Sequence, residues 1–214
     1  MTYLEKIQSD NDWFNPESLI ALICCGTDLH HPYEGWAGVV AVPLYKQSSM
    51  FKLYFNGFDD ALQEYENVPT YKIDNNMNKL DAFRALTSWV KNVCDNERVT
   101  FISSNASTWA SDIILSAMNE TGNIYKWWST VDLRVLYAVI KQRKKLQSAF
   151  DFGSILTMTD YKGLPKRFGL YAMAEEQLGD YQKTIPSCDK PEERLRLTAD
   201  ISRSLLATEY VEDD

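Results

Sequence analysis

The sequence predicts an α/β fold in which helices flank a mixed central sheet. Two observations favour it: three strand patterns follow one another early in the chain, and a helix, a further strand and more helices come after them. The first strand is expected over residues 19–25, an apolar run (Leu-Ile-Ala-Leu-Ile-Cys-Cys) that ends at Gly26. A continuous apolar run of this length is typical of a central strand that is covered on both faces.

Two more strands complete the first part of the predicted sheet. They are expected over residues 37–45 and 50–56, and the polar stretch Lys-Gln-Ser-Ser between them favours a turn. Three successive strands with short connections predict an antiparallel meander.

The rest of the chain is predicted to be mainly helical. Apolar residues at three- and four-residue steps predict a helix over residues 78–94, and a strand is expected over residues 99–103. The other expected elements are a short helix at 59–66, a helix at 109–119, a tryptophan-rich link, a helix capped by Thr130 or Asp132, a helix at 171–178 and a final helix from Pro191 to about Tyr210.

The composition is that of a folded chain. The sequence has 214 residues, of which 45% are hydrophobic, so we expect one domain over residues 1–214 with a frayed acidic tail at 211–214. The polar N-terminus is not typical of a signal peptide, and no apolar run reaches the roughly 20 residues that span a bilayer. We therefore expect no membrane partner.

Charge and cysteine content narrow the expected partners and compartment. The formal net charge is −8, whereas free-standing nucleic-acid-binding proteins usually present a positive field. An acidic chain is compatible with a basic protein surface as its partner, and a local basic patch stays open as an alternative. The cysteines form no Cys-x-x-Cys pair and are expected as reduced thiols in a cytoplasmic protein. They are Cys24, Cys25, Cys94 and Cys188.

Four segments share a pattern in chain order. A hairpin begins with the strand at 19–26, and a strand with a polar turn and a helix ending in Ile-Leu occupies residues 99–115. A Trp-Trp link followed by Asp-Leu-Arg lies at 126–136, and a closing helix lies at 195–210. These segments resemble the DEDD 3′–5′ exonuclease superfamily (DnaQ-like), and most closely its phage DexA and small exoribonuclease branch. The resemblance implies a ribonuclease-H-like fold.

The same resemblance implies which positions would carry chemistry. The family holds two divalent ions, Mg²⁺ or Mn²⁺, with four carboxylates, and a His serves as general base. At the family's Asp-x-Glu this chain has Ala21 and Ile23, at the second-motif Asp it has Ser111, and at the His it has Leu195. Only Asp200 falls at an expected acid position, and one carboxylate cannot hold two metal ions. We therefore expect no catalytic residue, no metal site and no cofactor.

Asp200 and Asp132 have structural interpretations. Arg196 and Arg203 lie four residues before and three residues after Asp200 on the expected helix, which favours a surface salt-bridge cluster over a metal ligand. Arg134 follows Asp132 by two residues, and we expect an intramolecular pair that locks the tryptophan-rich link onto the fold.

The functional hypothesis is a catalytically inactive, exonuclease-like protein, phage-encoded by resemblance, that works in the host cytoplasm. It would bind a host protein, for instance as an inhibitor of a host nuclease or defence system. One alternative is an active 3′–5′ exonuclease with a rearranged Mg²⁺ or Mn²⁺ site. The candidate acids for that site are Asp28, Glu34, Asp112, Asp132 and Asp200. A second alternative is a nucleic-acid-binding module.

Nucleic-acid binding would depend on a basic cluster and exposed tryptophans. The cluster comprises Lys141, Arg143, Lys144 and Lys145, and Lys162, Lys166 and Arg167 are possible neighbours. Cations at a helix C-terminus are also favoured by the helix dipole alone, which is the preferred interpretation. Trp127 and Trp128 are candidates for base stacking, although in a link between helices a core position is favoured for at least one of them.

Two acidic groups complete the candidates. The loop residues Asp28, His30, His31 and Glu34 include both histidines of the chain, and a polar loop is favoured there over a transition-metal site. A second group, Asp59, Asp60 and Glu64, is expected to stabilise a helix start rather than to catalyse a reaction.

Overall fold

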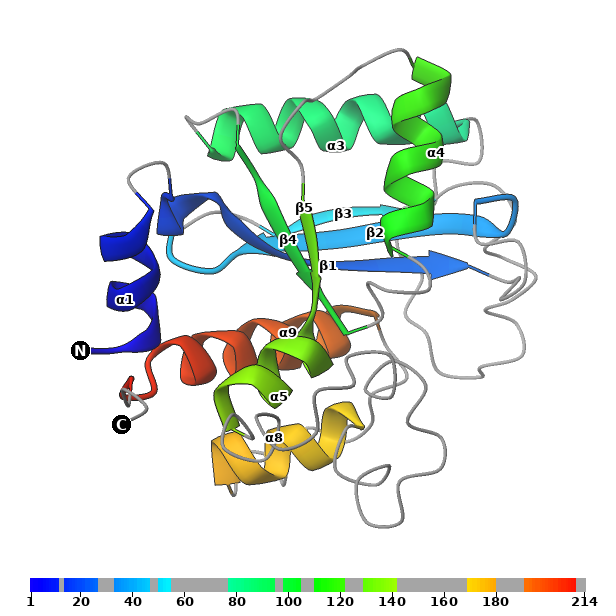
Figure 1. The fold of residues 1–214 in the computed structure, drawn as a ribbon. Helices are drawn as coiled ribbons and strands as arrows, with labels where there is room; N and C mark the ends of the chain where they lie inside the picture. The colour runs from blue at the N-terminus through cyan, green and yellow to red at the C-terminus, as the bar shows by residue number, and fades with distance from the viewer. Residues whose placement is uncertain are drawn as a thin grey trace.

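The fold is known from a computed structural model and is drawn in Figure 1. The structure describes residues 1–11, 14–26, 33–46, 50–54, 77–94, 98–104, 110–121, 129–141, 169–179 and 191–210. Within these ranges the chain forms an α/β structure, in which helices cover both faces of a five-stranded mixed sheet.

The sheet has the strand order β3-β2-β1-β4-β5. β1 (Leu19–Gly26), β2 (Trp36–Pro43) and β3 (Phe51–Tyr54) form the predicted antiparallel meander. β4 (Thr100–Ser103) runs parallel to the other edge of β1, and β5 (Ser129–Asp132) runs parallel to β4. β1 is thus the central strand, as its continuous apolar run predicted.

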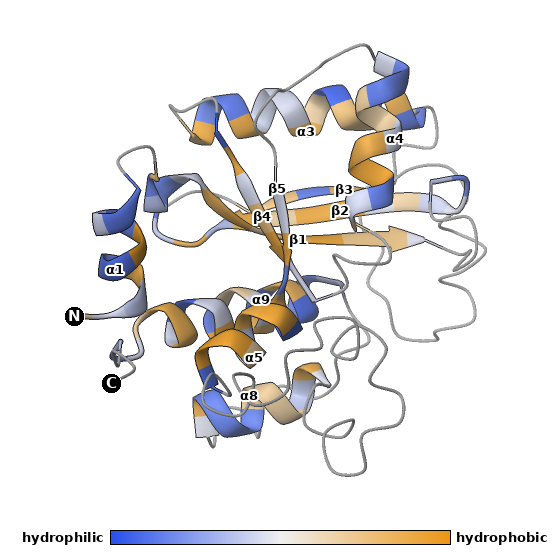
Figure 2. Cartoon of the chain, in the orientation of Figure 1, coloured by the Kyte–Doolittle hydropathy of each residue, from blue (hydrophilic) through white to orange (hydrophobic). Residues whose placement is uncertain are grey.

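The side chains of β1 alternate between two hydrophobic layers. Ala21 and Ile23 belong to one core cluster, and Ile20 and Leu22 belong to the other. Figure 2 shows β1 and β2 among the most hydrophobic segments of the chain. A strand with apolar residues on both faces needs a helical layer on each side, and the fold supplies both.

One layer consists of α3 (Lys79–Val93) and α4 (Ser111–Thr121). Asn78 caps α3 by accepting a hydrogen bond from the backbone N–H of Asp81. The stripe at three- and four-residue steps is buried, with Phe83 and Leu86 fully inside the core. The helix predicted over residues 78–94 is therefore confirmed.

The opposite layer consists of α5 (Leu133–Lys141), α8 (Leu170–Leu178) and α9 (Pro191–Leu206). Leu195 of α9 and Tyr137 of α5 pack in the same cluster as Ala21 of β1. The Tyr137 hydroxyl also donates to the carboxylate of Glu176 on α8, so a polar contact joins α5 to α8.

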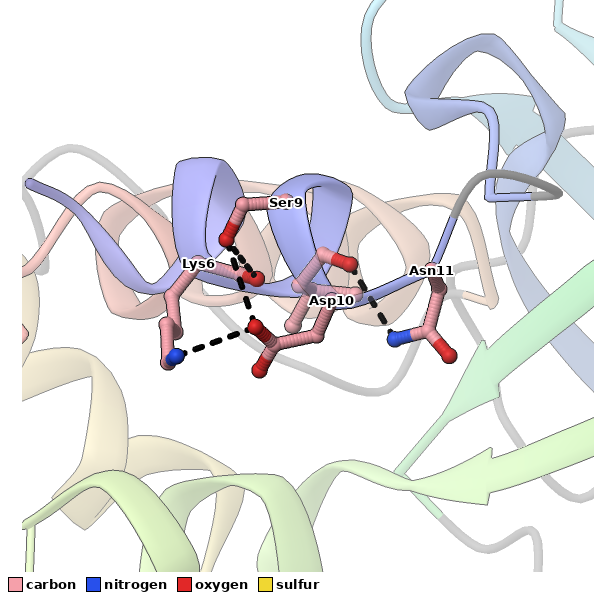
Figure 3. A network of polar contacts seen from close by, with 5 residues as sticks. Lys6, Ser9, Asp10 and Asn11 are labelled. Carbon is pink, nitrogen blue, oxygen red and sulfur yellow. Dashed lines mark hydrogen bonds and ion pairs between the residues drawn. The ribbon is translucent and has the colours of Figure 1, made fainter.

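The chain starts with α1 (Tyr3–Asp10), which has a capping box formed by Thr2 and Glu5. At its other end, Lys6 pairs with Asp10 at 2.9 Å, and the Asn11 amide donates to the carbonyl of Ile7 (Figure 3).

Backbone hydrogen bonds fasten α1 to the end of the described chain. The N–H of Tyr3 donates to the carbonyl of Thr208, and the N–H of Tyr210 donates to that of Met1. The rings of Tyr3 and Tyr210 pack edge to face. Residues near the two ends of the chain thus lie side by side.

Three expectations need correction or completion. The stretch before α5 was expected to be a link, but Ser129–Asp132 is the edge strand β5, because its backbone pairs with β4. The final helix ends at Leu206 and not at about Tyr210, because Glu209 forms a bridge with Thr2. Residues 3–10, for which no element was predicted, form α1.

The predicted helix at 59–66 and the tail at 211–214 lie outside the described residues.

The cysteine prediction is confirmed for the described positions. Cys24, Cys25 and Cys94 are buried thiols, and Cys188 lies outside the described residues. Burial raises the pKa of Cys25 to about 12 and that of Cys24 in the same direction. Among the described helices, none combines the length and the apolar character needed to cross a membrane.

Candidate functional site

Three of the positions at which the resemblance implies metal ligands or the catalytic His lie together in the fold. Ala21 and Ile23 face the α9 side of β1, and Leu195 of α9 packs in the same cluster. Their exposed fractions are 0%, 1% and 0%. The structure therefore brings three of these positions into one buried region, although Leu195 is more than 170 residues from β1 in the chain.

This region is apolar. Around these three side chains the same cluster contains Val40, Ile102 and other aliphatic residues. Mg²⁺ and Mn²⁺ bind through oxygen ligands, and alanine, isoleucine and leucine side chains supply none. Because they are buried among aliphatic side chains, these three residues are part of the hydrophobic core.

Ser111 lies apart from that cluster. It starts α4 on the opposite layer, and its Oγ is 2.5 Å from Oγ1 of Thr130 on β5. This hydroxyl pair joins the start of α4 to the edge strand. Asp112, the next residue, is exposed to solvent.

Asp200 forms the predicted ion pair. Its carboxylate lies 2.7 Å from Nη1 of Arg203, and Nε of Arg203 donates to the carbonyl of Leu44 at 2.6 Å. Arg203 thereby ties α9 to the chain just beyond β2, and Asp200 orients its guanidinium. The predicted pairing of Asp200 is confirmed for Arg203, in a half-buried ion pair.

The predicted pair of Asp132 and Arg134 is confirmed as well. Two nitrogens of the guanidinium donate to the two carboxylate oxygens, at 2.9 and 2.8 Å. Asp132 also accepts a hydrogen bond from the backbone N–H of Arg134 and so caps α5. The sequence had left Thr130 and Asp132 as the two candidates for this cap. The hydrogen bonds to Asp132 raise the pKa of Arg134. This buried carboxylate is fully engaged in holding the turn between β5 and α5.

The described acids of the rearranged-site hypothesis have separate surroundings. Asp132 and Asp200 pair with different arginines, and Glu34 lies near Lys79. No group of three or more His, Cys, Asp or Glu side chains suited to a metal ion occurs among the described residues. Asp28 of this hypothesis lies outside the described residues, as do His30 and His31 of the loop considered for a transition metal.

The basic cluster is described only at its first member. Lys141 is the last residue of α5 and is exposed, as a helix-terminal cation is expected to be. The other candidates lie outside the described residues: Arg143, Lys144, Lys145, Trp127, Trp128, Lys162, Lys166, Arg167, Asp59, Asp60 and Glu64.

An ion pair with one buried partner, which no sequence pattern predicted, lies beside the apolar region. Glu192, in the first turn of α9, has a side chain only 7% exposed, and its Oε1 lies 3.2 Å from Nζ of Lys52 on β3. Lys52 is opposite Val40 on β2, which in turn is opposite Ile23. The carboxylate thus lies on the α9 face of the sheet. Nothing in the local sequence joins two residues so far apart.

A second missed feature is an open cleft of about 590 Å³ on the other side of the molecule. Its walls come from the turn before β2, the start of α3 and the end of α4. The lining residues are Tyr33, Glu34, Met77, Asn78, Lys79, Leu80 and Glu120. Only Glu34 among them had been a candidate, as part of the polar loop.

Polar contacts organise this cleft. The Tyr33 hydroxyl donates to Oε2 of Glu120 at 2.9 Å, and Nζ of Lys79 donates to the carbonyls of Tyr33 and Glu34 at 2.7 and 2.5 Å. The same ammonium lies 5.1 Å from the centroid of the Tyr33 ring. Burial and the bond to Glu120 raise the pKa of Tyr33, and burial lowers the pKa of Lys79 against the attraction of Glu34 and Glu120.

No known protein-family model and no curated protein sequence matches this chain.

Proposed function

We propose that this protein is a catalytically inactive relative of the DEDD 3′–5′ exonucleases that acts by binding another protein. In this proposal the fold is ribonuclease-H-like and the exonuclease metal site has become part of the core. The observation that carries the proposal is the burial of Ala21, Ile23 and Leu195 in one apolar cluster.

The element order supports the fold part of this proposal. The three antiparallel strands are followed by α3, β4 and further helices, which is the order on which the sequence resemblance depends, with β5 as an additional strand. The two remaining candidate positions support the loss of catalysis, because Ser111 is engaged with Thr130 and Asp200 with Arg203.

Calorimetry and a nuclease assay on one sample test the loss of catalysis. Mn²⁺ and Mg²⁺ are titrated into the purified protein, and 3′-end shortening of labelled single-stranded DNA and RNA is followed. We expect no heat of metal binding and no degradation. Tight metal binding with shortening that is abolished in Asp200→Asn would instead identify a working exonuclease with a rearranged site.

The binding part of the proposal is supported by charge. A net charge of −8 favours a basic protein surface over nucleic acid as the main partner. By the same resemblance, the protein is phage-encoded and its partner is a host protein of the cytoplasm, such as a nuclease or a defence component. Affinity capture from bacterial lysate tests this, and recovery of no protein above background would refute it. Capture of nucleic acid that weakens steeply with salt would favour the nucleic-acid-binding alternative.

A further inference from the structure

We infer that the cleft lined by Tyr33, Lys79 and Glu120 binds a basic side chain, such as the guanidinium of an arginine, presented by a protein partner. The inference depends on the proposed function only for the biological source of that side chain. The recognition itself follows from the acceptors, the charge and the shape of the cleft.

Among the described residues that line the cleft, acceptors outnumber donors. Its polar groups include the carboxylates of Glu34 and Glu120 and the carbonyls to which Lys79 donates. The described donors are the Lys79 ammonium and the Tyr33 hydroxyl, which are already directed at these acceptors, and the Asn78 amide, which donates to the carboxylate of Asp81. With one cation and two carboxylates, the formal charge of these side chains is −1. A guest with donors and positive charge complements this arrangement, whereas an anion would be repelled.

Lys79 shows how a cation is accommodated there. Its ammonium lies over the ring of Tyr33 and donates to two backbone carbonyls. A guest would find a second set of acceptors at Glu120, which is exposed at the end of α4. Oε2 of that carboxylate accepts from Tyr33, while no described residue donates a hydrogen bond to Oε1.

The apolar lining suits the stem of a long basic side chain. Met77 and Leu80 line the cleft beside the carboxylates. Lysine and arginine bury their methylene stems against such surfaces while the charged head reaches polar groups. A cleft of about 590 Å³ is large enough to admit a side chain together with part of its backbone.

A peptide titration followed by NMR of the backbone amides tests the inference. The probe is acetyl-Gly-Arg-Gly-amide, and the neutral control replaces arginine by citrulline, which has the same shape. We expect the arginine peptide to shift the amides of Tyr33, Lys79 and Glu120 with a Kd of roughly 1–10 mM, the range for one anchored side chain. The citrulline peptide should leave those amides unchanged. Equal shifts with both peptides, or none with either, would overturn the inference.

A pair of variants separates the cleft from the overall charge. Glu120→Gln removes a carboxylate inside the cleft, and Asp112→Asn removes one from the exposed start of the same helix, α4. We expect the first variant to weaken arginine-peptide binding at least five-fold and the second to change it less than two-fold. Equal losses in both would mean that the peptide senses only net charge, which also overturns the inference.

The peptide titration and the lysate capture refute different claims. If the arginine peptide does not bind but lysate capture still yields a partner, only the role of the cleft is refuted. If the peptide binds and no partner is captured, the cleft inference holds and the proposed function falls.

Discussion

Removing the positive charge of Lys52 should lower the free energy of unfolding, because the buried carboxylate of Glu192 would lose its counter-ion. In Lys52→Met the side-chain stem is kept, but the Glu192 carboxylate loses the cation 3.2 Å from it. Neither of its oxygens accepts a hydrogen bond within the described part of the chain, so the charge would be left buried without compensation.

The expected magnitude follows from burial. Breaking a buried ion pair from one side costs about 3–5 kcal/mol. The Lys52 side chain is 41% exposed, so water screens part of the interaction, and we expect about 1–3 kcal/mol. For a chain of this length each kcal/mol lowers the Tm by about 2–4 °C, which gives a decrease of roughly 2–12 °C.

Urea denaturation and thermal melting monitored by circular dichroism measure the effect. The matched control is Arg84→Met, which breaks an ion pair to Asp81 between side chains that are 61% and 48% exposed. It should change the free energy of unfolding by less than about 0.5 kcal/mol. The double variant Lys52→Met/Glu192→Gln should recover much of the loss, because no buried charge is then left. A Lys52→Met protein as stable as the Arg84→Met control would refute the reasoning.

Three further predictions concern the core, a helix cap and the thiols. Gly38→Ala should cost about 1–3 kcal/mol in urea denaturation, since a Cβ there would overlap Cδ1 of Tyr54; a cost below about 0.5 kcal/mol would contradict that contact. Asp132→Ala should cost about 1–3 kcal/mol, because it removes both the cap of α5 and the partner of Arg134; in the same assay Arg134→Ala should cost less, since the cap remains. Burial raises the pKa of the Cys25 thiol to about 12 in the folded protein, whereas the pKa of an unfolded thiol is about 8.5. The stability that the buried neutral thiol contributes is therefore complete below about pH 8.5 and is lost as the pH rises toward 12. Stability measured from pH 8 to 10 should therefore fall less in Cys25→Ala than in the wild type, and parallel pH curves would count against this.

The sequence by itself determined those elements whose patterns are long and regular. The apolar run of β1 required cover on both faces, and the stripe of α3 required a core on one side. The pairs Asp132–Arg134 and Asp200–Arg203 were also predictable, because the partners are two and three residues apart. In such cases the local chain geometry already brings the side chains together.

Only the tertiary structure decided that residues 129–132 form the strand β5 and which residues far apart in the chain come into contact. Ser129–Asp132 is too short and too polar to show strand periodicity, and it is a strand because β4 offers a parallel edge for its backbone. The pair of Lys52 and Glu192 joins residues 140 positions apart, and the bond from Tyr33 to Glu120 spans 87. Such contacts depend on how strands and helices are stacked, and a local pattern of residue types contains no information on that arrangement.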